Sequence, residues 1–238
     1  GAVVTFNAPA ATDNCSSPTV VQTSGPASGS TFPVGSTLII FTATDSAGNT
    51  SACTLNIVVV DSDAPIVNCG ASITTCVGQS TSITAAATDM CSGIASLDYV
   101  LTGATTGSGS GNANIMFNAG VTTVTYTATD SSGNMSSCSY TVTAIAPAAV
   151  TTNATSTSPC LNDGIVTLIG TPAGGVWSGP GVTGSTFNPM TAGNGPHVLT
   201  YTYTDSSGCI SSGVLTIVVS PCVGIVENNG LQGIQVAP

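Results

Sequence analysis

A hydrophobic strand followed by a short turn with Asp and Gly occurs three times, as FTATDSAGNT (41–50), YTATDSSGNM (126–135) and YTYTDSSGCI (201–210). On both sides of each turn, apolar and polar residues alternate and β-branched residues are frequent, which is typical of a β-hairpin. The Asp can accept hydrogen bonds from backbone N–H groups two residues further on, and the Gly supplies a positive φ. We therefore expect three hairpins, with turns that begin at Asp45, Asp130 and Asp205.

The spacing of these turns predicts the domain organisation. They are 85 and 75 residues apart, which suits a small β-sandwich and exceeds the usual unit of a solenoid or propeller. No window of the chain keeps the i, i+3, i+4 apolar pattern of a helix. The sequence therefore predicts an all-β chain of three tandem Ig-like β-sandwich domains stapled by disulfides. Pro-bearing linkers place these domains at residues 1–61, 62–146 and 147–221, followed by a tail at 222–238.

Charge excludes several classes of function. The chain has no Lys or Arg and ten acidic residues, and 4% of its residues are charged, where about 25% is ordinary. Without cations it cannot neutralise phosphates or anionic headgroups, so we expect neither nucleic-acid binding nor binding to a membrane surface. No apolar run approaches the ~20 residues of a membrane span, so no direct membrane insertion is expected. The composition fits either a durable extracellular surface or a Thr/Ser-rich β-protein that has lost its few cations.

The nine cysteines recur with the repeats, which indicates disulfides formed in an oxidising compartment. In the first two units, Cys15 and Cys91 each lie two residues after an Asp. Cys53 and Cys138 each lie eight residues beyond the Asp that begins the hairpin turn. The predicted pairs are Cys15–Cys53, Cys91–Cys138, Cys69–Cys76 and Cys160–Cys209. Cys222 is left over, and an odd Cys is either a free thiol or an intermolecular link.

Several of these segments resemble a known family. GAVVTFNAPAATDNCS, FPVG and TATDSAGN with its closing Cys look like a hyalin repeat (HYR) domain, and TDMCSG with TATDSSGN marks a looser second copy. The third unit resembles Ig-like or polycystic-kidney-disease-like (PKD-like) repeats of large bacterial surface proteins. The tail CVGIVENNGLQGIQVAP resembles the start of a type IX secretion sorting domain. The resemblance implies a secreted or bacterial cell-surface protein of adhesion-type domains, with no catalytic residue and no required cofactor.

The resemblance also implies a Cys-bearing strand before the segment GAVVTF, whereas the given sequence starts at Gly1. We expect an open sheet edge there. Either the given sequence is a fragment of a longer chain, or a strand from another subunit fills the edge. Such head-to-tail donation generates a homopolymeric filament. The candidate donor is the tail, through Leu231, Ile234 and Val236. The alternative function is a non-polymeric surface adhesin that binds glycans or a partner protein.

Calcium is the cofactor that the sequence leaves open. Asp61 and Asp63 in VVDSDAP resemble a cadherin-like interdomain linker, and Ca²⁺ takes several oxygen ligands. Asp13 and Asp45 are expected to converge with them at the boundary between the first two domains.

Two single residues and five modification sites complete the candidates. Trp177 is expected to pack in a core and not to serve as a sugar platform, and His197 is expected to be a cap or surface residue without a catalytic partner. Ser46 lies in an Asp-Ser-apolar sequence like those O-glycosylated in proteins exported by type IX secretion. Asn-x-Ser/Thr sequences begin at Asn14, Asn49, Asn134 and Asn153.

Overall fold

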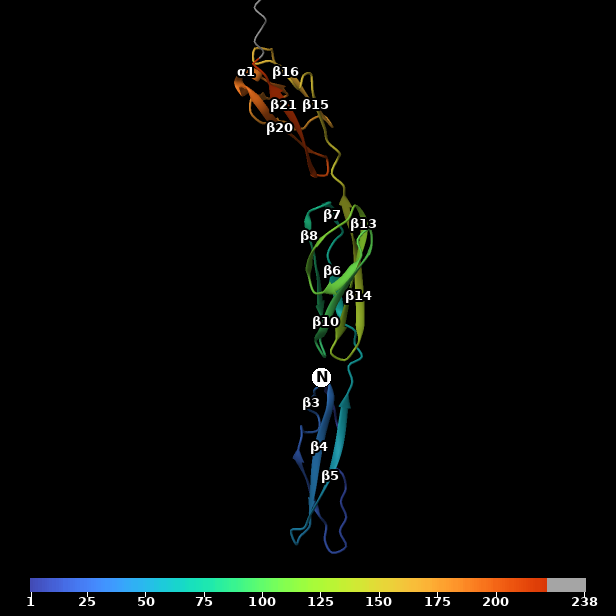
Figure 1. Ribbon diagram of the computed structural model, residues 1–238. Helices are drawn as coiled ribbons and strands as arrows, with labels where there is room; N and C mark the ends of the chain where they lie inside the picture. Colours follow the sequence, from blue (N-terminus) through green and yellow to red (C-terminus); the bar gives the residue numbers. More distant parts are fainter. Residues whose placement is uncertain (222–238) are drawn as a thin grey trace, which may run out of the picture. The chain divides into compact units, whose positions relative to one another are not determined.

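The computed structural model describes residues 1–221 and is almost entirely β, as the sequence predicts (Figure 1). The described residues fall into two compact units. The first holds Gly1–Thr74 and Gly78–Ala144, and the second holds Thr75–Val77 and the chain from Ile145 onward. The first unit contains the strands of two sandwiches, β1–β5 and β6–β14, and the second unit contains β15–β21.

The first sandwich is built on a long hairpin. Its strands are β1 (Ala2–Val3), β2 (Thr19–Ser24), β3 (Thr31–Phe32), β4 (Gly35–Thr44) and β5 (Thr50–Val59). One sheet has the order β2-β4-β5, and β1 pairs with β3. Phe32, Ile39 and Phe41 are buried, and Phe6 meets both Phe rings edge to face with centroids 6.1 Å apart. Alternate residues of β4 therefore point into the core, as the sequence pattern requires.

The second sandwich has more strands than the first. Its strands are β6 (Ile66–Cys69), β7 (Ile73–Cys76), β8 (Ser80–Ile83), β9 (Ala85–Thr88), β10 (Ile94–Gly103), β11 (Gly107–Ser110), β12 (Ala113–Met116), β13 (Gly120–Asp130) and β14 (Met135–Ile145). The main sheet has the order β11-β10-β13-β14-β7, while β12 pairs with β8 and β6 pairs with β9. Tyr126 at the centre of β13 is fully buried and lies 5.8 Å from the ring of Tyr99.

The third sandwich has two sheets and one short helix. Its elements are β15 (Thr151–Ala154), β16 (Val166–Thr171), β17 (Val176–Ser178), β18 (Val182–Thr183), β19 (Thr186–Phe187), α1 (Pro189–Ala192), β20 (Gly195–Thr204) and β21 (Ile210–Val219). The sheets have the orders β15-β16-β19-β18 and β17-β20-β21. Trp177 and Tyr201 pack in the core with centroids 5.1 Å apart.

The three predicted hairpins are confirmed as β4–β5, β13–β14 and β20–β21. Each turn Asp accepts backbone hydrogen bonds as expected: Asp45 Oδ1 accepts from the N–H groups of Ala47 and Asn49, both at 2.8 Å. Gly48, Gly133 and Gly208 have φ values of 87°, 91° and 83°. The repeated Asp and Gly therefore make the turns by local hydrogen bonding.

Most tyrosine side chains lie in the cores. Tyr126, Tyr140 and Tyr201 are buried, and Tyr203 is half-buried. Burial raises the pKa of Tyr126 to about 12, with smaller contributions from Tyr140 and Tyr99. A chain with so few aromatic side chains uses these rings to fill its small cores.

The predicted disulfide pairs are wrong. Cys69 bonds Cys138, and Cys76 bonds Cys209. Cys15, Cys53 and Cys91 are free and exposed. Cys160 is disulfide-bonded, but Cys209 is not its partner. Cys222 and the donor candidate Leu231, Ile234 and Val236 lie outside the described residues.

The physical reason lies in the folding of each repeat. Equivalent positions in two repeats have equivalent surroundings, and this does not make the two Cys within one repeat neighbours. Cys91 follows the loop turn at Asp89, whereas Cys138 lies on β14 beside the segment that carries Cys69. Only the folded arrangement brings the Cα atoms of Cys69 and Cys138 to 5.8 Å, within bonding range.

Candidate functional site

The first sandwich contains a cleft of about 360 Å³, which we call the strand cleft. Residues 9–13 form one wall and residues 50–53 of β5 form the other, with Phe41 and Val20 between them. Cys53 is exposed and its thiol is free. The strand cleft therefore combines extended backbone, apolar side chains and a nucleophile.

The second sandwich shows what occupies the equivalent place. Its Asp89-Met-Cys91 matches Asp13-Asn-Cys15, so β9 corresponds to residues 9–12. Cys138 and Cys53 each lie eight residues beyond their turn Asp. There β6 pairs with β9 from Ile66↔Thr88 to Cys69↔Ala85, and Cys69 bonds Cys138. One strand thus fills the cleft and is tied to its wall by a disulfide.

In the first sandwich no strand among residues 1–221 pairs with residues 9–12. Residues 9–12 are in no strand, although their counterparts form β9. β5 is the edge of its sheet among the described strands, whereas β14 has β7 on the corresponding side. The edge leaves backbone N–H and C=O groups free to pair with another strand.

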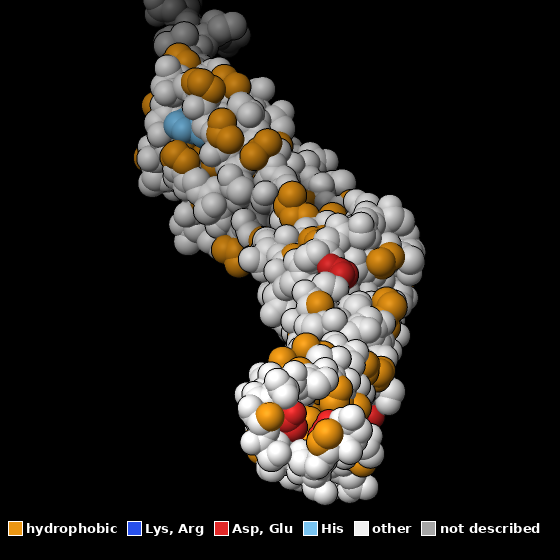
Figure 2. All heavy atoms as spheres, turned by 90° about the horizontal axis from the view of Figure 1, so that it is seen from below, with side chains coloured by type: hydrophobic (Ala, Val, Ile, Leu, Met, Phe, Trp, Pro, Cys, Tyr) orange, Lys and Arg blue, Asp and Glu red, His pale blue; other side chains and the backbone are white. Residues whose placement is uncertain are grey.

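The surface carries few charges, all of them acidic among Lys, Arg, Asp and Glu, and is partly apolar. Val21, Leu38, Val58 and Val60 in the first unit are exposed by half or more. The face in Figure 2 carries acidic side chains only as separate patches among hydrophobic and neutral polar atoms. The lining of the strand cleft includes Asp13, Asp45 and Asn49 beside its apolar residues, and it has no Lys or Arg.

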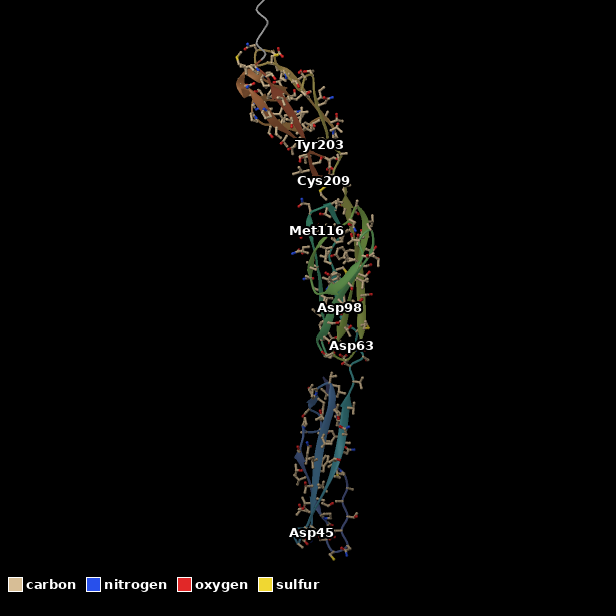
Figure 3. All side chains as sticks on the ribbon, in the orientation of Figure 1. Asp45, Asp63, Asp98, Met116, Tyr203 and Cys209 are labelled. Atoms are coloured by element: carbon tan, nitrogen blue, oxygen red, sulfur yellow. A yellow bond between two sulfur atoms is a disulfide. The ribbon has the colours of Figure 1, made fainter. Side chains whose placement is uncertain are left out.

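The expected convergence of four aspartates is wrong. Asp45 begins the turn where Thr44 pairs with Thr50, and Asp61 follows the opposite end of the hairpin, where Gly35 pairs with Val59. Figure 3 shows Asp45 and Asp63 at these opposite ends. Ten-residue strands rise about 3.3 Å per residue, so Asp45 is far from Asp61.

Asp61 and Asp63 do lie close together, within a group that also includes Cys91. A second group, Asp61, Asp89 and Asp130, was not foreseen from the sequence. The signal that could have found it is the repeat itself, since Asp89 and Asp130 are both turn residues at one end of their sandwich.

Trp177 is confirmed as a core residue, with 7% of its surface exposed, so it is not available as a sugar platform. His197 lies on β20, where its Nε2 is 2.8 Å from the carbonyl oxygen of Gly193 and its ring lies beside Phe187. This is a local packing role, as expected for an isolated His.

The candidate modification sites differ in access. Ser46, Asn14 and Asn153 are exposed. Asn49 is exposed, but its side-chain nitrogen donates to Asp45 at 2.7 Å. Asn134 is half-buried, and its nitrogen donates to Asp130 Oδ2 and to the carbonyl oxygen of Asp61. Glycosylation at these positions stays a prediction.

Comparison with known proteins gives the family. The HYR domain matches residues 1–59 and 60–144, more than half of the chain, and the chain belongs to this family of non-catalytic, adhesion-type domains. The two matches contain the first and second sandwiches. No curated protein matches the sequence significantly. Within residues 1–221, no helix has the length and apolarity needed to cross a membrane.

Solved structures show distant similarity of fold. "Ca2+-stabilized adhesin helps an Antarctic bacterium reach out and bind ice" is 16% identical with a TM-score of 0.36, over 78% of this chain and 57% of that one. The protocadherin structure "PcdhgB3 EC1-4" is 13% identical with a TM-score of 0.31, over 88% and 65%. The glucan-binding SGBP-B of Bacteroides ovatus is 12% identical with a TM-score of 0.30, over 68% and 48%. The chain thus spans about half to two thirds of these proteins.

Proposed function

We propose that this protein is a non-enzymatic extracellular structural protein whose first HYR domain accepts a β-strand in the strand cleft, so that subunits join head to tail into a surface fibre. The observation that carries the proposal is the empty strand position beside Cys53, which in the second HYR domain holds β6. Localisation at a bacterial cell surface follows the family and the composition. Export by type IX secretion rests on the tail sequence alone.

Strand docking has a clear driving force. An incoming strand would pair with residues 9–12 as β6 pairs with β9, and would cover the half-buried Val20, which lines the cleft. Main-chain hydrogen bonds would supply affinity and alternate side chains would supply specificity. The chain carries only acidic charges, so salt would not weaken such assembly and would screen the repulsion between subunits.

The proposed occupant in a fibre is the tail of another copy, through Leu231, Ile234 and Val236. The donor segment 230–238 contains no Cys, so docking of that segment by itself would leave the Cys53 thiol free. A donor that resembles β6 would instead bring a Cys and close a disulfide. The state of Cys53 in native material therefore distinguishes the two donors.

The first test is microscopy and size-exclusion chromatography of the full chain. We expect fibres, and a variant with Leu231, Ile234 and Val236 all replaced by Asp should remain monomeric. A full chain that stays monomeric and forms no fibres at high concentration excludes self-donation by the tail.

The second test probes the strand cleft directly. A synthetic peptide with the sequence of residues 61–70, DSDAPIVNCG, is first activated at its Cys as a mixed disulfide with 5-thio-2-nitrobenzoate. The Cys53 thiolate of the full chain should attack the peptide sulfur and release thionitrobenzoate faster than it does with an equally activated scrambled peptide. Cys53→Ser should abolish this adduct, whereas Cys15→Ser should leave it unchanged. Equal rates for both peptides would show that only thiol exposure matters.

The alternative function is that of a glycan-binding adhesin. Trp177 cannot be the aromatic side chain that stacks against a sugar in such an adhesin, because it lies in the core. A partner protein that donates the strand remains compatible with the strand cleft. Monomeric full-length protein with a positive peptide test would favour that form of the proposal.

A further inference from the structure

Three carboxylates meet inside the second HYR domain. Asp61 follows β5, Asp89 begins the loop after β9, and Asp130 ends β13, and one oxygen from each lies within 4.8 Å of the others. Asp61 is 6% exposed and Asp130 is 1% exposed. Three acidic groups from separate parts of the sequence are therefore gathered at a mostly buried point.

Turn formation explains two of the three residues. Asp89 Oδ1 accepts backbone hydrogen bonds from Cys91, Ser92 and Gly93 at 2.7–3.0 Å. Asp130 Oδ1 accepts from the N–H groups of Ser132 and Asn134, and its Oδ2 accepts from Asn134 Nδ2. These bonds are the usual ones of Asx turns.

Turn formation does not explain Asp61. Its Oδ1 accepts from the N–H of Asp63 at 3.1 Å, but its Oδ2 is buried and has no hydrogen-bond partner. A buried carboxylate oxygen without a donor is strongly unfavourable unless a cation or a proton compensates it. The position of Asp61 therefore points to something that the cluster binds.

No Lys or Arg side chain can supply the compensating charge, because the chain contains neither. Hydrogen bonds from neighbouring groups lower the pKa of the other two members of the cluster. The pKa of Asp89 is lowered, chiefly by the backbone N–H of Ser92. For Asp130 burial is the largest influence and raises the pKa, but hydrogen bonds from Asn134, Ser132 and Gly133 together lower it.

We propose that Asp61, Asp89 and Asp130 bind one Ca²⁺ ion within the second HYR domain. Calcium takes oxygen ligands at 2.3–2.6 Å, so two oxygens on one ion lie at most about 5 Å apart, and the cluster meets this limit. The remaining ligands of its usual 6–8 would be waters and backbone carbonyl groups. Asp61 is shared with the group that contains Asp63 and Cys91, but a thiol does not suit so hard a cation.

The ion would have a structural role beyond strand docking. It would connect the segment before β6, the loop after β9 and the β13–β14 turn. Few hydrogen bonds link these three regions otherwise; in one of them, Asn134 Nδ2 donates to the carbonyl oxygen of Asp61 at 3.2 Å. The first HYR domain provides a matched comparison. Asp13 and Asp45 correspond to Asp89 and Asp130, but no group of three ligands forms there among the described residues.

The test is calorimetric titration and thermal unfolding of the full chain after treatment with EDTA. We expect one Ca²⁺ per chain, and a Tm about 5 °C or more higher when Ca²⁺ is present at ~100 times its Kd. Asp61→Asn should weaken Ca²⁺ binding at least tenfold. Asp45→Asn, in the equivalent turn of the first domain, should leave Ca²⁺ binding unchanged.

Asp61→Asn also separates binding from a purely structural role. Without metal this change removes an uncompensated buried charge, so Tm in EDTA should stay the same or rise, and only the increase caused by Ca²⁺ should be lost. Equal loss of Tm with and without Ca²⁺ would overturn the proposal, as would no heat and no Tm shift with millimolar Ca²⁺. Tighter binding of Zn²⁺ that depends on Cys91 would reject calcium as the ligand.

Discussion

Cys69 on β6 is bonded to Cys138 on β14, while Cys53, the counterpart of Cys138 in the first HYR domain, is exposed and free. The same position is thus a free thiol in the first repeat and part of a disulfide in the second. The proposed role of the first domain as a strand acceptor rests on this difference between the two domains.

Loss of the Cys69–Cys138 bond should destabilise the second domain. The two residues are 69 positions apart, and the chain-entropy relation gives about 4 kcal/mol for a loop of this length. Urea unfolding of Cys69→Ala with Cys138→Ala should show this loss. Cys53→Ser is the control and should leave the unfolding midpoint within error.

The pattern of free and bonded thiols can be checked chemically. Alkylation of the native, metal-free monomer should label Cys15, Cys53 and Cys91, and non-reducing peptide maps should recover Cys69–Cys138 and Cys76–Cys209. Trypsin is unsuitable since the chain has no Lys or Arg. Cleavage before Asp would leave Cys69 and Cys76 together in the peptide 63–88, so a protease that cleaves at apolar residues such as Ile73 is needed to separate the two bonds. Recovery of a Cys15–Cys53 peptide would contradict the structure.

Packing around Tyr201 gives a stability prediction for the third sandwich. Its hydroxyl donates to the carbonyl oxygen of Pro172 at 2.6 Å and accepts from the N–H of Gly175. A Cβ on Gly170 would lie 2.4 Å from the Tyr201 ring. Gly170→Ala should therefore cost about 1–3 kcal/mol by overpacking, measured by chemical denaturation.

Gly164 is the matched control for this substitution. A Cβ there would have no neighbour within 4 Å, so Gly164→Ala should have almost no effect on stability. Similar losses for both variants would mean that the contact with Tyr201 is not the cause.

Stability should decrease in acid. The pKa values of Asp13, Asp45, Asp89, Asp98 and Asp130 are all lowered from 3.8. For Asp98 the cause is first the hydroxyl of Ser110 and then that of Ser96. A carboxyl whose pKa is lower in the folded state stabilises the fold above its unfolded pKa, and this contribution is lost as pH falls through the folded value.

We therefore expect Tm in EDTA to change little from pH 7 to about pH 4. Tm should decrease once the pH is below 3.8, the pKa of an Asp side chain in the unfolded chain. Asp98→Asn should reduce the acid-dependent part of this fall. A Tm that rises on acidification below pH 4 would show that repulsion between carboxylates outweighs their hydrogen bonds.

The sequence by itself determined the local structure. The alternation of FTATD and its copies, with Asp and Gly at fixed places, was enough to predict three hairpins and an all-β fold, because a hairpin depends on neighbours in the chain. The core position of Trp177 and the local role of His197 also followed from sequence.

Only the tertiary structure decided the long-range relationships. Whether Cys69 lies beside Cys76 or Cys138, whether Asp61 lies near Asp45 or Asp130, and where a strand position is empty all depend on how strands distant in sequence are packed. Repetition identifies equivalent residues but does not identify which of them are in contact. The physical reason is that disulfides and metal sites require atoms a few ångströms apart, and only the packed sheets fix those distances.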